Sequence, residues 1–359
     1  KKIEQTSDLE SIVVATSQHR EMTKQMCQEF SIFPDIDLDI MKPAQTLSYI
    51  TEQIAVHFEK VLIENRPDFI LVQGDTTSAC ICGLIAFYNN IPVGHVEAGL
   101  RTYNPDFPYP EEINRQLISR LATFNFAPTV RAKENLLNEK INPPKIFFTG
   151  NTIVDALQYL LEQKNIIPHI EQKQNSNNRK ILVTAHRREN FGKPMENICL
   201  AINDLTERFN DLEIIFPVHP NPKVRKTVAE FIRPGKQIHL LDPLGYSELI
   251  EIMAGSTLIL TDSGGIQEEA PTLHKPVLVL RDVTERPEIV KAGGAIMVGS
   301  HRDKIVRETS RLLTDKRIYD SMVNIRNPFG DGHAADRIID TLMWYFNIEI
   351  EKRTPALKE

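Results

Sequence analysis

The chain has 359 residues, enough for two domains of ordinary size, and its 41% hydrophobic and 25% charged residues are typical of a globular protein. The net charge is −6, and Lys and Arg are scattered along the chain, so we expect no nucleic-acid partner, which would require a concentrated basic face. No apolar stretch is long enough to cross a bilayer and no secretory signal opens the chain, so we expect a cytoplasmic protein with no membrane partner.

Short apolar runs alternate with longer amphipathic segments from one end of the chain to the other. Residues 44–66 form the clearest helical pattern, because their apolar positions recur at steps of three and four. A last helix is expected at about Ala334–Phe346. Strand–helix alternation predicts parallel sheets that helices cover on both faces. The expected strands are Ser11–Thr16, Phe69–Gln73, Ile91–Glu97, Ile146–Thr149, Lys180–Thr184, Glu213–Val218, Gln237–Leu241, Thr257–Thr261 and Pro276–Leu280.

The polar stretch 171–179 is the clearest linker and falls near the middle of the chain. We therefore expect an α/β protein with two Rossmann-like, doubly wound domains, residues 1–168 and 169–333, and a crevice between them. Residues 334–359 would pack back on the first domain. The four cysteines lack paired zinc-site spacing and are interpreted as buried, reduced thiols: Cys27, Cys80, Cys82 and Cys199.

Polar residues follow several apolar runs, at the carboxyl ends of strands where parallel sheets bind their ligands. These are Asp75, Glu97, His186 and Ser263, and Glu111 lies just inside a helix start. Asp75 could instead cap a helix, and Glu111 could complement a helix dipole. Three carboxylates in one cleft raise one another's pKa, which suits proton transfer without a metal.

The segment "TDSGGIQEEAP" (261–271) combines two demands on a ligand. The backbone N–H groups of Gly264 and Gly265 can hold a phosphate at a helix start. Glu268 and Glu269, one turn later, suit the two hydroxyls of a ribose, and Arg286 can add contacts to phosphate. The alternative is a plain Gly-rich turn before an acidic helix. A nucleotide, such as a nucleotide sugar, meets both demands.

Nine segments together resemble the non-hydrolysing UDP-N-acetylglucosamine 2-epimerases, in order and over nearly the whole chain. The resemblance implies a glycosyltransferase-B type fold, a site between two Rossmann-like domains, a homodimer and no cofactor. It also implies reversible conversion of UDP-GlcNAc to UDP-ManNAc through 2-acetamidoglucal. The segments are "QHREM", "GDTTS", "HVEAGLRT", "PEEINR", "TGNTIVDA", "VTAHRREN", "TDSGGIQEEAP", "RDVTERPE" and "NPFGDG".

The resemblance also implies roles for individual residues. Asp75, Glu97 and Glu111 would form the acid–base set, and His186 would contact the substrate or the developing charge on UDP. The UDP-binding residues would be Ser263, Gly264 and Gly265 at the diphosphate, Glu269 at the ribose and Arg286 at the phosphates.

Two features depart from the family pattern. The family begins with a strand and a Gly-Thr-Arg-Pro-Glu turn, and this sequence starts beyond that segment, so we expect it to be truncated there. Gln18, Arg187 and His219 match positions of an allosteric UDP-GlcNAc site in many bacterial members, but Ala44 stands where those members have arginine.

Four other functions stay open at this stage. Two are close relatives: an epimerase acting on UDP-2,3-diacetamido-2,3-dideoxyglucuronate, and a hydrolysing epimerase that releases free ManNAc. A glycosyltransferase of the same fold would need an acceptor groove, which nothing in the sequence marks. A nucleotide-sugar sensor would bind the ligand without turnover, and fold resemblance alone does not exclude it.

Overall fold

The computed structural model describes residues 1–16, 20–40, 42, 45–167, 178–233, 235–350 and 353–358, with the side chains of 20–23 excepted. Gln18, Ala44 and most of the expected linker therefore lie outside the described residues. The chain forms two compact units, Lys1–Ala156 with Phe329–Glu359, and Leu157–Pro328. Among the described helices, none is both long and apolar enough to cross a membrane.

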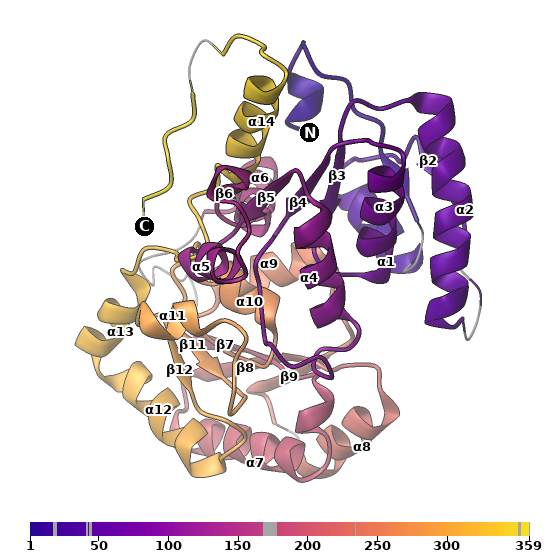
Figure 1. The fold of residues 1–359 in the computed structure, drawn as a ribbon. Coiled ribbons are helices and arrows are strands. Elements are labelled where there is room, and N and C mark those ends of the chain that lie inside the picture. The colour runs from indigo at the N-terminus through magenta and orange to yellow at the C-terminus, as the bar shows by residue number, and fades with distance from the viewer. Residues whose placement is uncertain are drawn as a thin grey trace. The chain divides into compact units, whose positions relative to one another are not determined.

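The first unit contains a four-stranded parallel sheet in the order β3-β4-β5-β6 (Figure 1). Its strands are β3 (Ile70–Gln73), β4 (Val93–Val96), β5 (Phe124–Ala127) and β6 (Ile146–Phe148). The helices are α1 (Arg20–Glu29), α2 (Leu47–Asn65), α3 (Thr77–Tyr88), α4 (Glu111–Leu121), α5 (Val130–Asn138), α6 (Thr152–Lys164), which continues into the second unit, and α14 (Ala334–Tyr345).

Opposite faces of this sheet pack against different parts of the chain. On one face, α2 and α3 bury an aliphatic cluster that includes Ile54 and Ala86. On the other face, Phe124 and Phe126 contact α14, where Tyr345 meets the Phe124 ring edge-on at 5.3 Å. The residue between them, Asn125, points the other way and donates to the Ser119 carbonyl of α4. Alternation along β5 thus places aromatic side chains under α14 and an amide toward α4.

The second unit contains a six-stranded parallel sheet in the order β12-β11-β10-β7-β8-β9. Its strands are β7 (Arg179–Thr184), β8 (Leu212–Pro217), β9 (Ile238–Leu241), β10 (Leu258–Thr261), β11 (Val277–Val279) and β12 (Ala295–Met297). Its helices are α7 (Lys193–Arg208), α8 (Pro222–Phe231), α9 (Tyr246–Gly255), α10 (Gly264–Glu269), α11 (Pro287–Lys291), α12 (Arg302–Thr314) and α13 (Lys316–Val323).

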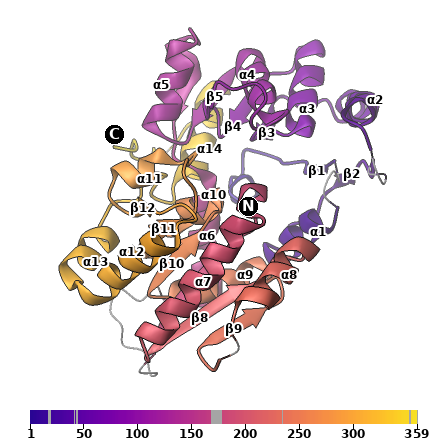
Figure 2. The ribbon, with the colours of Figure 1, turned by 90° about the horizontal axis from the view of Figure 1, so that it is seen from below.

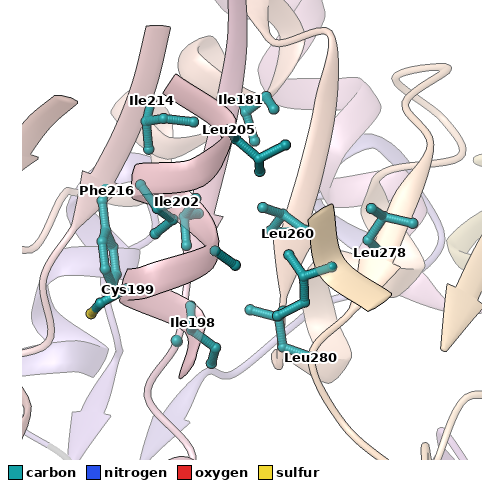
Figure 3. Packing of buried hydrophobic residues seen from close by; sticks show 14 of the residues in the cluster. Ile181, Ile198, Cys199, Ile202, Leu205, Ile214, Phe216, Leu260, Leu278 and Leu280 are labelled. Atoms are coloured by element: carbon teal, nitrogen blue, oxygen red, sulfur yellow. The ribbon is translucent and has the colours of Figure 1, made fainter. Parts of the chain in front are cut away.

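The core of the second unit follows the two-residue period of its strands. Alternate strand residues such as Ile181, Ile214 and Leu260 pack against Ile198 and Ile202 of α7 (Figure 3). α8 and α12 flank α7 on this face (Figure 2), and α9 and α10 lie on the opposite side (Figure 1). Full burial of each such aliphatic side chain contributes about 1.5–3 kcal/mol, so this face provides a rigid base for the loops at the strand ends.

The expected strands all occur, with ends shifted by a few residues. The first is much shorter than predicted: only Val14–Ala15 is a strand (β1), and it pairs with β2 (Ile36–Asp37) rather than with the four-stranded sheet. Three strands were not predicted: β2, β5 and β12. β5 was missed because Asn125 interrupts its apolar run. The expected helix at 44–66 occurs as α2.

The cysteines are free thiols, as predicted. Cys80, Cys82 and Cys199 are buried in the two cores, whereas Cys27 is only half-buried. Burial raises the pKa of Cys82 and of Cys199 to about 12, so both remain protonated and unreactive.

Candidate active site

In the first unit, Asp75 lies in the turn after β3. Gly74 adopts φ 71°, which lets the chain reverse direction before α3 begins. Thr76 caps α3 by accepting a hydrogen bond from the Ala79 amide at 3.1 Å. The interpretation of Asp75 as the helix cap is therefore wrong, because the neighbouring threonine has that role. The Asp75 carboxylate is 2.7 Å from the Arg115 guanidinium instead.

Glu97 lies at the end of β4, the neighbour of β3 in the sheet. Its backbone has φ 65°, in the left-handed region that costs a non-glycine residue on the order of 1–2 kcal/mol. The side chain is half-buried, and its Oε2 lies 3.9 Å from the position that a Gly74 Cβ would occupy. The unusual backbone therefore turns this carboxylate toward the Gly74–Asp75 turn.

Glu111 is the first residue of α4, and two other side chains of this helix contact Asp75. Arg115, four residues later, forms the ion pair with the Asp75 carboxylate, and Asn114 donates to the Asp75 carbonyl at 2.9 Å. Residues four apart share a helix face, so Glu111 starts the face that meets Asp75. The structure thus places Asp75 and Glu97 at one edge of the first sheet, and Glu111 at the start of the helix that contacts Asp75.

Glu112, the next residue of α4, is held by several hydrogen bonds. Its carboxylate is fully buried and accepts hydrogen bonds from the Thr102 amide at 2.9 Å, the Tyr103 amide at 3.1 Å and Gln116 at 2.8 Å. Burial alone would raise the pKa of Glu112, but these bonds lower it below the usual range. Glu112 therefore holds the loop after β4 against α4.

His95 is a site residue that sequence reasoning missed. It is fully buried within β4, and burial lowers its pKa to about 4. The neutral ring donates from Nε2 to the Gly74 carbonyl at 2.8 Å. His95 thereby fixes the turn that presents Asp75. The available signal was a histidine inside an apolar strand directly before Val96 and Glu97.

In the second unit, His186 follows β7 and is held by Asp262, which follows the neighbouring strand β10. Asp262 Oδ1 lies 3.0 Å from His186 Nδ1, and Oδ2 accepts from the amides of His186 and Arg187, each at 2.9 Å. Asn190 donates to the same Oδ2 at 2.8 Å. Burial would raise the pKa of Asp262, but these partners lower it. Asp262 lies within the segment "TDSGGIQEEAP", and the sequence pattern alone does not predict its contact with His186.

Ser263, Gly264 and Gly265 form the turn that opens α10. Ser263 is the N-cap residue, and its amide donates to Thr261 Oγ1 at 2.9 Å. A Cβ added at Gly264 would lie 3.9 Å from Arg187 Nη2, and one at Gly265 would have its nearest neighbour, Ser263 Oγ, at 4.0 Å. The turn is therefore uncrowded, and a guanidinium lies beside it, an arrangement suited to an anion.

The other two predicted UDP-binding residues have protein partners. Arg286 Nε donates to the buried Glu268, so its position is set by a neighbouring carboxylate. Tyr246 donates to Glu269 Oε1 at 2.6 Å. Burial, which the Tyr246 hydrogen bond offsets only in part, raises the pKa of Glu269 to about 7. Tyr246 was missed because it lies on α9, far from the motif in sequence.

The described candidate allosteric residues, Arg187 and His219, both lie beside His186. The His219 ring stacks on the His186 ring, with centroids 6.1 Å apart and an interplanar angle of 24°. The Asn221 amide donates to His219 Nδ1 at 3.2 Å, so that nitrogen is an acceptor. Burial and the neighbouring His186 lower the pKa of His219.

Comparisons with known proteins identify the family of this chain. The UDP-N-acetylglucosamine 2-epimerase family profile matches residues 1–343. The chain is 46% identical over 340 residues to the UDP-N-acetylglucosamine 2-epimerase of Escherichia coli, with 93% of this chain and 90% of that protein covered. It is 45% identical over 345 residues to the Bacillus subtilis protein of the same name, with 96% and 90% covered.

Solved structures give the same result. UDP-GlcNAc 2-epimerase from Neisseria meningitidis bound to UDP-GlcNAc matches with a TM-score of 0.86 and 44% identity, over 96% of this chain and 94% of that one. The likeness, together with parallel sheets in both units, confirms the expected α/β fold of the glycosyltransferase-B type. The chain belongs to the UDP-N-acetylglucosamine 2-epimerase family.

Proposed function

We propose that the protein catalyses the reversible epimerisation of UDP-GlcNAc to UDP-ManNAc at C2 of the sugar. Family membership over nearly the whole chain supports the substrate, since relatives at 45–46% identity carry that name. The observation that supports the chemistry is that Asp75 and Glu97 meet at the Gly74 turn and that α4, which Glu111 begins, contacts Asp75. Asp75 and Glu97 end neighbouring strands, and Arg115 connects Asp75 to the helix that Glu111 begins.

The C2 hydrogen of the sugar has no neighbouring carbonyl to acidify it, so the proton is removed together with loss of UDP. Inversion at C2 then needs two proton transfers, one that removes a proton and one that returns it. One carboxylate removes the C2 proton while the bond between C1 and the UDP oxygen breaks, and UDP leaves with the electron pair. The product of this step is 2-acetamidoglucal. A second group returns a proton to the opposite face of C2 as the UDP oxygen adds back to C1. Positioned acid and base groups of this kind each contribute about 10²–10⁴-fold to a rate.

The second unit would hold UDP. The open turn at Gly264 and Gly265, with Arg187 beside it, suits the diphosphate. Glu269 would accept the ribose hydroxyls through its carboxylate. His186 would contact the departing diphosphate and stabilise the charge that develops there. Arg286 would act at the phosphates after exchanging its contact with Glu268.

The direct test is to incubate the purified protein with UDP-GlcNAc, without added metal or nicotinamide cofactor, and to follow the sugar signals by proton NMR. We expect UDP-ManNAc to appear, and the same mixture to form from UDP-ManNAc. Accumulation of free ManNAc and UDP would indicate a hydrolysing enzyme. Tight UDP binding with unchanged UDP-GlcNAc would indicate a sensor, and either result would overturn the proposal.

We also propose that the protein works as a homodimer in the cytoplasm. The family resemblance supports the dimer, and the buried reduced thiols suit a reducing compartment. Light scattering coupled to size-exclusion chromatography would measure the mass in solution. We expect twice the mass of one chain, and a monomer mass at micromolar concentration would contradict the dimer.

A further inference from the structure

The turn that carries Asp75 begins where the hydrogen-bond ladder between β3 and β4 ends. The last paired residues are Gln73 and Val96, and the Gly74 amide donates to the Val96 carbonyl at 3.0 Å. The carbonyl of Gly74 accepts from a side chain instead, Nε2 of His95 on β4, at 2.8 Å. A side chain of the neighbouring strand thus continues the pairing by one carbonyl into the turn.

The neighbours of His95 determine where its ring carries hydrogen. A carbonyl oxygen only accepts hydrogen bonds, so Nε2 must be the N–H nitrogen. Nδ1, on the other side of the ring, lies 3.4 Å from Ser119 Oγ, which accepts from Arg101 Nη2 at 3.2 Å. Burial lowers the pKa of His95 to about 4, and the Arg101 and Arg115 guanidinium groups act in the same direction, whereas the bond to Gly74 opposes them. His95 is therefore a neutral donor across the physiological pH range.

The conformation of Gly74 makes this bond important for Asp75. Gly74 has φ 71°, and a glycine backbone is less restricted than that of any other residue. The Gly74 carbonyl and the Asp75 amide belong to one planar peptide unit, so holding the oxygen also sets the direction in which the chain enters Asp75. The Asp75 carbonyl in turn accepts from Asn114 at 2.9 Å. The carbonyls before and after the Asp75 side chain are thus both held by side chains.

Glu97, two residues after His95, reaches the same glycine. Its Oε2 lies 3.9 Å from the position that a Gly74 Cβ would occupy. Two side chains from the end of β4 therefore meet one turn after β3, one as a hydrogen-bond donor and one as a carboxylate. Rotation of the peptide between Gly74 and Asp75 would break the His95 bond and move Asp75 relative to Glu97.

We propose that His95 is a positioning residue for catalysis: by donating to the Gly74 carbonyl, it fixes the peptide that leads into Asp75 and so sets where the Asp75 carboxylate meets the sugar. The consequence for turnover rests on the proposed epimerase function, whereas the hydrogen bond itself does not. Proton transfer stays with the carboxylates, and His95 keeps its hydrogen throughout. A misplacement of about 1 Å near the reacting atoms lowers a rate by about 10²-fold.

The variants His95→Gln and His95→Met form a matched pair. In glutamine the amide nitrogen is as many bonds from Cβ as Nε2 is in histidine, and it can donate to the Gly74 carbonyl. Methionine has a methyl group at the corresponding place and donates nothing. We expect His95→Met to lower kcat about 10²-fold with little change in KM or UDP affinity, and His95→Gln to restore most of the loss. Wild-type kcat in His95→Met, or equal losses in both variants, would overturn the proposal.

Ile54→Ala separates positioning from stability. Ile54 is fully buried in the aliphatic cluster of the same unit, and His95→Met leaves the Gly74 carbonyl without its donor, so both variants should unfold at lower temperature than wild type. In assays well below both unfolding temperatures, only His95→Met should lose kcat. An equal loss in Ile54→Ala would show that turnover follows the stability of the unit, and would refute the proposal.

NMR of wild type labelled with ¹⁵N-histidine and ¹³C-glycine tests the bond itself, whether or not a variant folds. We expect one histidine Nε2–H that exchanges slowly with water and shows a scalar coupling across the hydrogen bond to a glycine carbonyl. A spectrum without this coupling would overturn the proposal. If wild type does not epimerise UDP-GlcNAc, the proposed function fails, and the coupling still decides whether His95 holds the turn.

Discussion

Single residues at the carboxyl ends of strands carry the proposed chemistry, and the backbone of one of them is strained. Glu97 adopts a left-handed conformation at φ 65° that most side chains avoid, and buried His95 fixes the adjacent Gly74 carbonyl. Strain of this kind persists only where the surroundings enforce it. The residue types at these positions could be predicted from sequence, because polar residues after apolar runs stand out. Their supporting partners could not be predicted, because Asp262, Tyr246 and Arg115 act through contacts distant in sequence.

Replacing Glu97 with glutamine tests the acid–base set. Gln keeps the size of the side chain and cannot take up a proton, so we expect turnover to fall about 10²–10⁴-fold while UDP binding stays nearly unchanged. Glu134→Gln, on the exposed face of α5, is the matched control and should have wild-type activity. Calorimetry would measure UDP binding and NMR the turnover. Near-normal turnover of Glu97→Gln would remove this residue from the set.

The pH dependence of UDP binding tests Glu269. Burial raises its pKa to about 7, so the carboxyl is mostly neutral at pH 6 and mostly ionised at pH 8. Only the ionised form accepts hydrogen bonds from both ribose hydroxyls at full strength. The affinity advantage of wild type over Glu269→Gln should therefore grow as pH rises through 7, by about tenfold. Comparing the two proteins cancels the titration of UDP itself.

Tyr246→Phe provides the control for this measurement. The Tyr246 hydroxyl donates to Glu269 and lowers its pKa, so removing the hydroxyl should move the transition to higher pH. Calorimetric titrations between pH 6 and 9 would follow both effects. A wild-type advantage over Glu269→Gln that is constant from pH 6 to 8 would contradict the assigned role.

At the scale of elements, the pattern of apolar runs predicted most of the strands. It missed β5, in which a polar residue interrupts the apolar run. β5 contains the buried Asn125, whose amide nitrogen donates to the Ser119 carbonyl while its Oδ1 has no hydrogen-bond partner. β1 is only two residues long, although the apolar run around it predicted a strand of six. Apolar runs alone therefore miss a strand that contains a buried amide and overestimate the length of another strand.

The packing of α14 on the first sheet gives a prediction about stability. Ile338 is 5% exposed and packs with Val96, Phe124 and Phe126. Ile338→Ala should lower the free energy of unfolding by about 2–5 kcal/mol, because it removes buried methyl groups and leaves a cavity. Ile63→Ala, at a site 61% exposed on α2, is the control and should change it by only about 0.5 kcal/mol.

Urea denaturation, followed by circular dichroism, would measure both variants. Val96 directly precedes Glu97, so α14 supports the strand that presents a catalytic candidate. Equal losses in the two variants would mean that the contact between α14 and the sheet contributes little to the stability of this unit.

At the scale of the whole molecule, the organisation into two α/β units could be predicted from strand–helix alternation. The points at which the chain passes from one unit to the other could not be predicted in this way. The first crossing lies inside the continuous helix α6, and the chain returns to the first unit at Phe329. The Phe329 carbonyl accepts from the Asn151 amide at 2.7 Å, a contact between residues far apart in sequence. Local patterns do not encode such contacts, so boundaries inferred from them shift by several residues.

The most direct test of the account is the epimerisation of UDP-GlcNAc in heavy water by the purified protein. Elimination and re-addition require the proton at C2 to come from the protein's exchangeable groups. We therefore expect UDP-ManNAc with deuterium at C2, identified by loss of the C2 proton signal in NMR. UDP-ManNAc that forms with its original C2 proton retained would contradict the proton-transfer mechanism assigned to Asp75, Glu97 and Glu111.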